Sequence, residues 1–317
     1  LLTNENDARA ILLLENIKQV LKYNETEGNP LFGKINEEKL AIGGHSRGGE
    51  AVNIAYLMNK EGINPGNGRI KYHYNFNISS IIAIAPTVDQ YKPTNKSITL
   101  KDVNYLVIHG ANDQDVYQFS GLKQYKNIQY TGEGEYIKTA LYCAGCNHGQ
   151  FNSRWGLYDR EGLYRKALNV KNFVSENEQQ RIAEIFIKVF LDCTLKERKE
   201  HIKLLQDCNL YKAYLPETLY IQCYKTSDFI PLCDFEEDIN LQSGTMEDVN
   251  IEVVGGDIWT EGIYPSEVPN SNSAMYLAWS QHKLPTVTIY TPDINLLERN
   301  LQFDVMDLRE NFSEEDI

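Results

Sequence analysis

The sequence lacks an apolar run long enough for a membrane-spanning helix. Its longest runs, such as residues 11–14 and 81–86, fall far short of the roughly 20 residues that a bilayer requires. It also lacks basic residues, because 31 Lys and Arg stand against 44 Asp and Glu and give a formal net charge of -13. No basic stripe is visible. We therefore expect no membrane span, and neither nucleic acid nor an anionic membrane surface as the main partner.

The N-terminal residues show no charged segment followed by an apolar stretch and a cleavage site, so no export signal is visible. Cysteine is also sparse, since six residues in a chain of 317 are too few for a disulfide scaffold. Cys143 and Cys146 form a C-x-x-C pair, which could be a redox pair or half of a zinc site. No second C-x-x-C and no paired histidines accompany it. We expect free thiols, no metal site and no cofactor.

What the sequence does contain is a globular composition, with 42% hydrophobic and 11% aromatic residues and enough length for two domains. Helical spacing of apolar residues occurs at 8–23, 50–60, 176–191 and 195–206. Mostly apolar runs that predict buried strands occur at 40–43, 78–85, 103–110 and 136–144. Alternating strands and helices are typical of a parallel α/β sheet, whose ligands bind beyond the carboxyl ends of the strands.

The pattern changes in the last third of the chain. Short alternating segments separated by Gly, Pro, Asn and Ser occur at 218–224, 249–254, 274–279 and 286–290. These segments predict an all-β, sandwich-like domain. We place an α/β domain over residues 1–208 and the all-β domain over residues 209–317.

A glycine-flanked serine follows the first predicted strand. Residues 44–48 read Gly-His-Ser-Arg-Gly and fit the G-x-S-x-G nucleophile elbow, with a strand before the motif and a helix after it. In this motif the strand turns so sharply into the helix that the serine is strained and exposed, and residues without Cβ must flank it. Ser46 is the candidate nucleophile. The backbone N–H of Arg47 is the candidate oxyanion donor.

An acid and a base follow two later predicted strands. Asp113 comes after the strand at 103–110, and His148 comes after the strand at 136–144. Serine, acid and histidine in this chain order are expected of α/β hydrolases. Two alternatives for the acid remain open: Asp115 with Asp113 as a turn cap, or Asp89 after the strand at 78–85.

Residues around the candidate base have simpler readings as well. Phe151 and Trp155 either line an acyl pocket or pack in the core. His109, at the end of its strand, is expected to be a packing residue.

These three residue types support nucleophilic catalysis. A serine hydroxyl is a poor nucleophile, so His148 must take its proton during attack on an acyl carbon and later return it to the leaving group. Asp113 would hold the imidazole in the required tautomer. The sequence therefore predicts a serine hydrolase that cleaves small carboxylic esters through an acyl-enzyme. A peptidase on the same triad is the alternative.

A function from another class has to be weighed beside this one. Under this alternative, the hydrolase domain is degenerate and inactive, and the protein works through its β-domain as a carbohydrate-binding or cell-surface protein. Trp259, Tyr264, Tyr276 and Trp279 would then form a sugar-stacking face, although burial in a sandwich core is the simpler role for most of them.

Three segments resemble one known family. Residues 44–49 resemble the lipase motif of chlorophyllases, residues 109–116 are similar to the family's acid loop, and residues 147–152 to its histidine loop. The family comprises α/β hydrolases that include chlorophyllases, platelet-activating-factor acetylhydrolases and bacterial cutinase-like polyester hydrolases. The resemblance runs from about residue 5 to about residue 192. It implies an α/β-hydrolase-type parallel sheet with flanking helices, and the triad Ser46, Asp113 and His148.

The chain departs from this family at its front. In the family, several strands and the loop with the second oxyanion donor precede the helix that here begins near residue 8. We therefore expect an N-terminally incomplete sheet, a fragment of a longer protein, and an isolated chain that is inactive. A trailing β-sandwich is also seen in some bacterial relatives.

Overall fold

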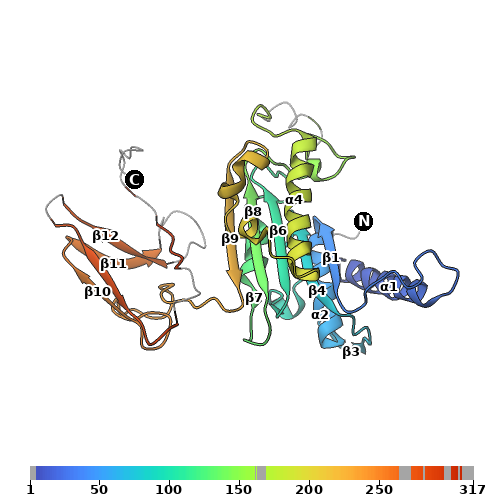
Figure 1. Ribbon diagram of the computed structural model, residues 1–317, viewed down its shortest axis with the longest axis horizontal. Coiled ribbons are helices and arrows are strands. Elements are labelled where there is room, and N and C mark those ends of the chain that lie inside the picture. The colour runs from blue at the N-terminus through green and yellow to red at the C-terminus, as the bar shows by residue number, and fades with distance from the viewer. Residues whose placement is uncertain are drawn as a thin grey trace. The chain divides into compact units, whose positions relative to one another are not determined.

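The computed structural model describes residues 5–160, 162, 169–263, 273–280, 283–295, 301–305 and 308. The chain divides into two compact units, Leu1–Phe229 and Ile230–Ile317 (Figure 1). The larger unit holds a mixed sheet with helices, and the smaller unit holds small antiparallel sheets. This is the α/β class followed by an all-β unit, as the sequence predicts.

The larger unit alternates helices and strands through most of its length. Its helices are α1 (Asn6–Glu25), α2 (Arg47–Glu61), η1 (Pro93–Asn95), α3 (Ser120–Lys126), η2 (Gly149–Phe151), α4 (Glu176–Leu195), α5 (Ile202–Gln206) and η4 (Cys208–Tyr214). Its strands are β1 (Leu40–His45), β2 (Ile63–Asn64), β3 (Asn67–Lys71), β4 (Ile78–Ile84), β5 (Leu100–Lys101), β6 (Asn104–Gly110), β7 (Ile128–Gln129), β8 (Ile137–Cys143) and β9 (Tyr220–Thr226). The four predicted buried strands are β1, β4, β6 and β8.

The central sheet has five strands in the order β1-β4-β6-β8-β9. The first four run parallel in chain order, and β9 pairs antiparallel with β8. The carboxyl ends of β1, β4, β6 and β8 therefore meet at one edge of the sheet. The turns that follow these strands carry the predicted site residues.

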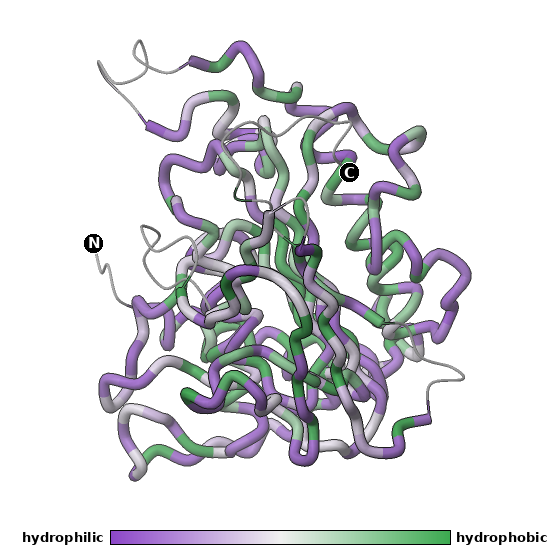
Figure 2. The backbone as a smooth tube through the Cα atoms, turned by 90° about the vertical axis from the view of Figure 1, so that its left-hand side faces the viewer, coloured by the Kyte–Doolittle hydropathy of each residue, from purple (hydrophilic) through white to green (hydrophobic). Residues whose placement is uncertain are grey.

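The two faces of the sheet are covered by different helices, because side chains alternate between faces along each strand. Ile81 and Tyr105 pack with residues of α1 and α2, whereas Ile82 and Leu106 pack with residues of α4 and α5. Figure 1 shows α4 lying across one face, and Figure 2 shows hydrophobic residues along the strands of the sheet. Strands buried on both faces read as continuous apolar runs, so the sequence revealed them.

The expected boundary after residue 208 is wrong, because the α/β unit extends to Phe229. Strand β9, predicted to open the all-β domain, is the antiparallel edge strand of the main sheet. A short alternating segment does not indicate which sheet it will join, since edge strands and sandwich strands share that pattern. The helix predicted over 195–206 is also shorter, and α5 begins at Ile202.

The smaller unit contains two antiparallel strand pairs among its described residues. One joins β10 (Asn250–Val254) to β13 (Thr286–Tyr290), and the other joins β11 (Ile258–Ile263) to β12 (Ser273–Ala278). Strands β10, β12 and β13 match predicted segments, while β11 was missed. Gly262 and the charged Glu261 interrupt the apolar alternation of β11, which weakens the strand signal.

Candidate active site

Ser46 occupies the turn between β1 and α2 in a strained backbone conformation. Its φ is 57° and its ψ is -125°, a region that non-glycine residues rarely adopt. The backbone holds it there, because the Ser46 N–H donates to Ile84 O (2.9 Å) and Ser46 O accepts from Thr87 N (3.2 Å). Such strain at a strand-to-helix turn is the geometry of a nucleophile elbow.

Glycine is required at two positions of this turn. A Cβ on Gly44 would lie 2.1 Å from Gly48 O, and a Cβ on Gly49 would lie 2.8 Å from the Cβ of Pro86. A Cβ on Gly48 would meet nothing within 4 Å. The close approach of strand and helix therefore involves Gly44 and Gly49, and the second glycine of the pentapeptide motif contributes only its backbone.

Arg47 is the first residue of α2, and its N–H is one of the amide groups that a helix cannot satisfy internally. It follows Ser46 directly, where it can donate to an oxyanion formed at the serine. The Arg47 side chain is exposed. The predicted role of Arg47 depends only on its backbone.

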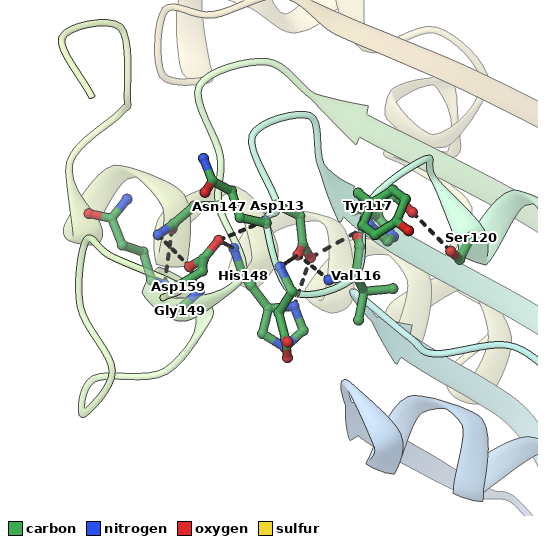
Figure 3. Close-up of polar contacts among 12 residues, drawn as sticks. Asp113, Val116, Tyr117, Ser120, Asn147, His148, Gly149 and Asp159 are labelled. Atoms are coloured by element: carbon green, nitrogen blue, oxygen red, sulfur yellow. Dashed lines mark hydrogen bonds and ion pairs between the residues drawn. The ribbon is translucent and has the colours of Figure 1, made fainter. Parts of the chain in front are cut away.

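Asp113 and His148, which the sequence predicts to be an acid and a base, are in direct contact (Figure 3). Asp113 Oδ2 lies 2.7 Å from His148 Nδ1, and both residues are buried. Asp113 Oδ1 accepts from the backbone N–H groups of Asp115 (2.9 Å) and Val116 (2.6 Å). The carboxylate thus holds Nδ1 as the protonated nitrogen and leaves Nε2 to act as a base.

The Nε2 atom of His148 is buried and has no hydrogen-bond partner in the part of the chain that the structure describes. The Ser46 hydroxyl is therefore not hydrogen-bonded to it in this structure. Catalytic hydrogen bonds are often long before substrate binds and tighten in the complex. His45, the residue before Ser46 in the chain, has its ring centroid 4.5 Å from that of His148.

The pKa of His148 is raised above its usual value. Burial alone would lower this pKa, but the hydrogen bond and the charge of Asp113 outweigh the effect of burial. The charges of Asp115 and Asp159 raise the pKa further. His45 behaves in the opposite way, because burial and then the neighbouring His148 lower its pKa to about 4. His45 is therefore neutral at physiological pH.

The two alternative acids occupy different positions. Asp115 Oδ2 lies 3.5 Å from His148 Nε2, on the other ring nitrogen from Asp113, and its side chain is 60% exposed. Asp89 forms ion pairs with Lys123 and, at 3.6 Å, with Lys92. Asp113 is thus the carboxylate that contacts Nδ1, and Asp89 forms its ion pairs with lysines instead.

Asp159 is a site residue that the sequence did not predict. Its Oδ2 accepts from Gln114 N and His148 N (both 3.0 Å), and its Oδ1 accepts from Gly149 N (2.7 Å) and Asn147 Nδ2 (2.8 Å) (Figure 3). One carboxylate therefore joins the acid loop to the histidine loop. Asp159 follows no predicted strand, so periodicity offered no signal for it.

The acid and histidine loops also touch directly. A Cβ on Gly110 would lie 2.4 Å from Cys146 O, and Asn112 N donates to that same oxygen at 2.9 Å. Gly145 N in turn donates to Asn112 Oδ1 at 2.9 Å. The C-x-x-C segment thus forms a tight turn against the acid loop. Cys143 and Cys146 are free and buried, and burial, then the contact with Cys146, raises the pKa of the Cys143 thiol.

The aromatic residues after His148 lie beside the imidazole. The Trp155 ring stacks on His148 at 5.8 Å and an angle of 18°, and 55% of this residue is exposed. Phe151 lies 6.2 Å from the ring of His45. Trp155 is therefore at the surface of the site, while the partly buried Phe151 packs against the α4 side of the sheet.

His109 lies closer to the site than its predicted packing role implies. It is fully buried, with Nε2 at 2.6 Å from Val116 O and 3.6 Å from Asp113 Oδ2. Burial lowers the pKa of His109, so this histidine is neutral beside Asp113. It packs as predicted and also supports the loop that carries Asp113.

A second buried carboxylate lies under the elbow. Glu50, in the first turn of α2, is 3% exposed and accepts from Asn6 Nδ2 (2.8 Å), Thr87 Oγ1 (2.7 Å) and Tyr91 N (2.9 Å). Burial raises its pKa. Thr87 N also donates to Ser46 O, so Thr87 connects the Glu50 carboxylate to the strained turn at Ser46. The sequence places it in a helix but gives no sign of its partners.

The remaining predictions lie outside this site. Among the described residues, no group of three or more His, Cys, Asp and Glu side chains is arranged to hold a metal ion. No described helix is both long enough and apolar enough to cross a membrane. In the smaller unit Trp279 is 52% exposed and Trp259 is partly buried, while Tyr264 lies outside the described residues.

Comparison with protein-family models and with curated proteins found no match to this chain. The chemistry of the site therefore has to be inferred from its own geometry. That geometry combines a strained serine, a histidine whose tautomer is set by a buried carboxylate, and a free amide donor beside the serine.

Proposed function

We propose that the chain is a serine hydrolase that cleaves carboxylic esters through an acyl-enzyme, with Ser46 as nucleophile, His148 as base and Asp113 as orienting acid. Two observations carry this proposal: the 2.7 Å contact between Asp113 and His148, and the strained backbone of Ser46 at φ 57° and ψ -125°. Strain of this kind persists only where surrounding structure maintains it, and it concentrates at functional sites.

The proposed chemistry has two halves. Ser46 Oγ attacks the acyl carbon, its proton passes to His148 Nε2, and the carbonyl electron pair becomes an oxyanion that the Arg47 N–H binds. The oxyanion then collapses, the bond to the alcohol oxygen breaks, and Nε2 returns the proton to that oxygen. Water, deprotonated by the same Nε2, then releases the acid and restores Ser46. Every proton moves through one nitrogen.

The same proposal extends to the fold. The four parallel strands in chain order, with the nucleophile, acid and base following β1, β6 and β8, support an α/β-hydrolase-type sheet. The two strand pairs of the smaller unit support a sandwich-like accessory domain.

Labelling with a fluorophosphonate probe tests the nucleophile. The full-length protein should be labelled at Ser46, Ser46→Ala should not be labelled, and Ser153→Ala, which changes an exposed serine five positions after His148, should be labelled normally. Hydrolysis of p-nitrophenyl esters but not of peptide anilides would separate an esterase from a peptidase. If the folded full-length protein is not labelled at Ser46, the proposal is wrong.

A further inference from the structure

Asp115 occupies a position that the acyl-transfer chemistry does not require. Its Oδ2 lies 3.5 Å from His148 Nε2, the nitrogen that must take and return the proton. Asp113 already orients the imidazole from Nδ1. The Asp115 side chain is 60% exposed, so it faces the solvent side of the base, where substrate must arrive.

Among the described residues, the ion-pair partner of Asp115 is the imidazole of His148. Within the described ranges of the chain, no Lys or Arg forms a salt bridge with Asp115. Arg160 is held beside this loop by a hydrogen bond from its Nε to Gln114 O at 2.9 Å. Asp113 and Asp159 add negative charge around His148, and they contribute to its raised pKa.

An aromatic face lies on the same imidazole. Trp155 stacks on His148 at 5.8 Å, and 55% of this large side chain remains in solvent. An exposed indole next to an exposed carboxylate is a combination that attracts organic cations, because the ring face is electron-rich and the charge is opposite. In the described part of the chain, the neighbour that these two residues share is the imidazole of His148.

The position of the leaving group connects these features to the reaction. To receive its proton, the alcohol oxygen of an ester must come within about 3 Å of His148 Nε2. A charge two or three bonds beyond that oxygen then lies within a few Å of Asp115, at a distance where opposite charges attract even in water. The acyl portion, bonded to Ser46, does not share this position.

We propose that Asp115 is a specificity-determining residue that favours esters whose alcohol portion carries a positive charge, with Trp155 as the apolar side of the cation site. This inference rests on the proposed esterase function. It identifies the class of substrate: a carboxylic ester of an amino alcohol or a quaternary ammonium alcohol.

A pair of nearly isosteric substrates tests the inference on the full-length protein. The choline ester and the 3,3-dimethylbutyl ester of the same short acid differ chiefly in one charge, and hydrolysis of both is followed by acid release in a pH-stat. Because the ammonium group also makes an ester intrinsically more reactive, the measured quantity is the kcat/KM ratio of the two esters, compared between variants. The ratio also cancels any change in the basicity of His148.

Asp115→Asn should lower this ratio by about tenfold at low salt. Trp155→Leu should lower it less. The matched control is Glu133→Gln, which removes an exposed acid in the turn before the amino end of β8, away from the edge that carries the triad, and it should leave the ratio unchanged. For the unmodified chain, the ratio should fall as salt is raised, because Asp115 is exposed and its field is screened.

The outcomes separate the inference from the function beneath it. If both esters are hydrolysed and Asp115→Asn leaves the ratio and its salt dependence unchanged, the inference is overturned and the esterase stands. If Ser46 is labelled by the fluorophosphonate but the choline ester is not hydrolysed, the inference is likewise overturned. If Ser46 is not labelled and neither ester is hydrolysed, the proposed function itself fails.

Discussion

Asp113 and His148 are 35 positions apart in the sequence and meet through a 2.7 Å contact between Oδ2 and Nδ1. The contact depends on two loops that follow β6 and β8, and these loops are joined by hydrogen bonds and by the carboxylate of Asp159. The contact between Asp113 and His148 is thus held by the loops at this edge of the sheet.

Replacing Asp113 by Asn should abolish most of the activity. The amide cannot hold Nδ1 in the required tautomer, and the expected loss of kcat is on the order of 10⁴-fold. Asp115→Asn should retain far more activity towards a neutral ester, because its carboxylate contacts Nε2 and does not orient the ring. Steady-state kinetics of the two variants with one p-nitrophenyl ester decides between the acids. A larger loss for Asp115→Asn would assign the orienting role to Asp115.

The pH dependence of kcat/KM should show an acid limb set by His148. Only the neutral imidazole can accept the proton of Ser46, and the carboxylates, Asp113 foremost, raise the pKa of His148 above its usual value. Activity should therefore fall as pH drops through a pKa above about 6.5. Removing the charge of Asp115 should move this limb to lower pH, which a profile of kcat/KM from pH 5 to 9 would measure. An unchanged limb would mean that Asp115 does not affect the base.

The two motif glycines should respond differently to alanine. Gly44→Ala places a Cβ 2.1 Å from Gly48 O, so it should destabilise the fold by about 3 kcal/mol or more. Gly48→Ala meets open space within α2 and should stabilise it by about 0.5–1 kcal/mol. Urea denaturation of both variants provides the comparison. Equal effects would show that strand and helix are not in close contact at Gly44.

Glu50→Ala should weaken both the fold and the elbow. It removes the acceptor of Thr87 Oγ1 and Tyr91 N and one of the two acceptors of Asn6 Nδ2, at a cost of about 3 kcal/mol. Glu50→Gln keeps the shape and one acceptor, so its effect should be smaller. The free energy of unfolding, together with the rate of fluorophosphonate labelling at Ser46, would separate loss of the fold from loss of the turn. A cost below about 1 kcal/mol would contradict the buried network.

Cys143 and Cys146 should be inert in the native chain. Both thiols are buried, and burial raises the pKa of Cys143, whereas the reactive form of cysteine is the thiolate. Iodoacetamide should modify neither residue under native conditions and both in denaturant, as judged by mass mapping of peptides. Rapid native modification, or recovery of a disulfide between them, would restore a redox role.

The sequence by itself determined the elements that position the site. Apolar runs identified β1, β4, β6 and β8, because strands buried on both faces carry few polar residues. Glycine spacing and chain order identified Ser46, His148 and a short acidic segment around Asp113. These signals come from residues close together in the chain, so the sequence alone reveals them.

Only the tertiary structure decided which carboxylate faces which nitrogen. Asp113 and Asp115 are two positions apart, and their placement on opposite sides of the imidazole depends on how the loop after β6 folds against His148. The partners of Glu50 and Asp159 likewise come from segments far apart in the chain or outside any strand. Hydrogen bonds between distant segments leave no periodicity in the sequence, and the same holds for β9, whose pattern suits an edge strand of either unit.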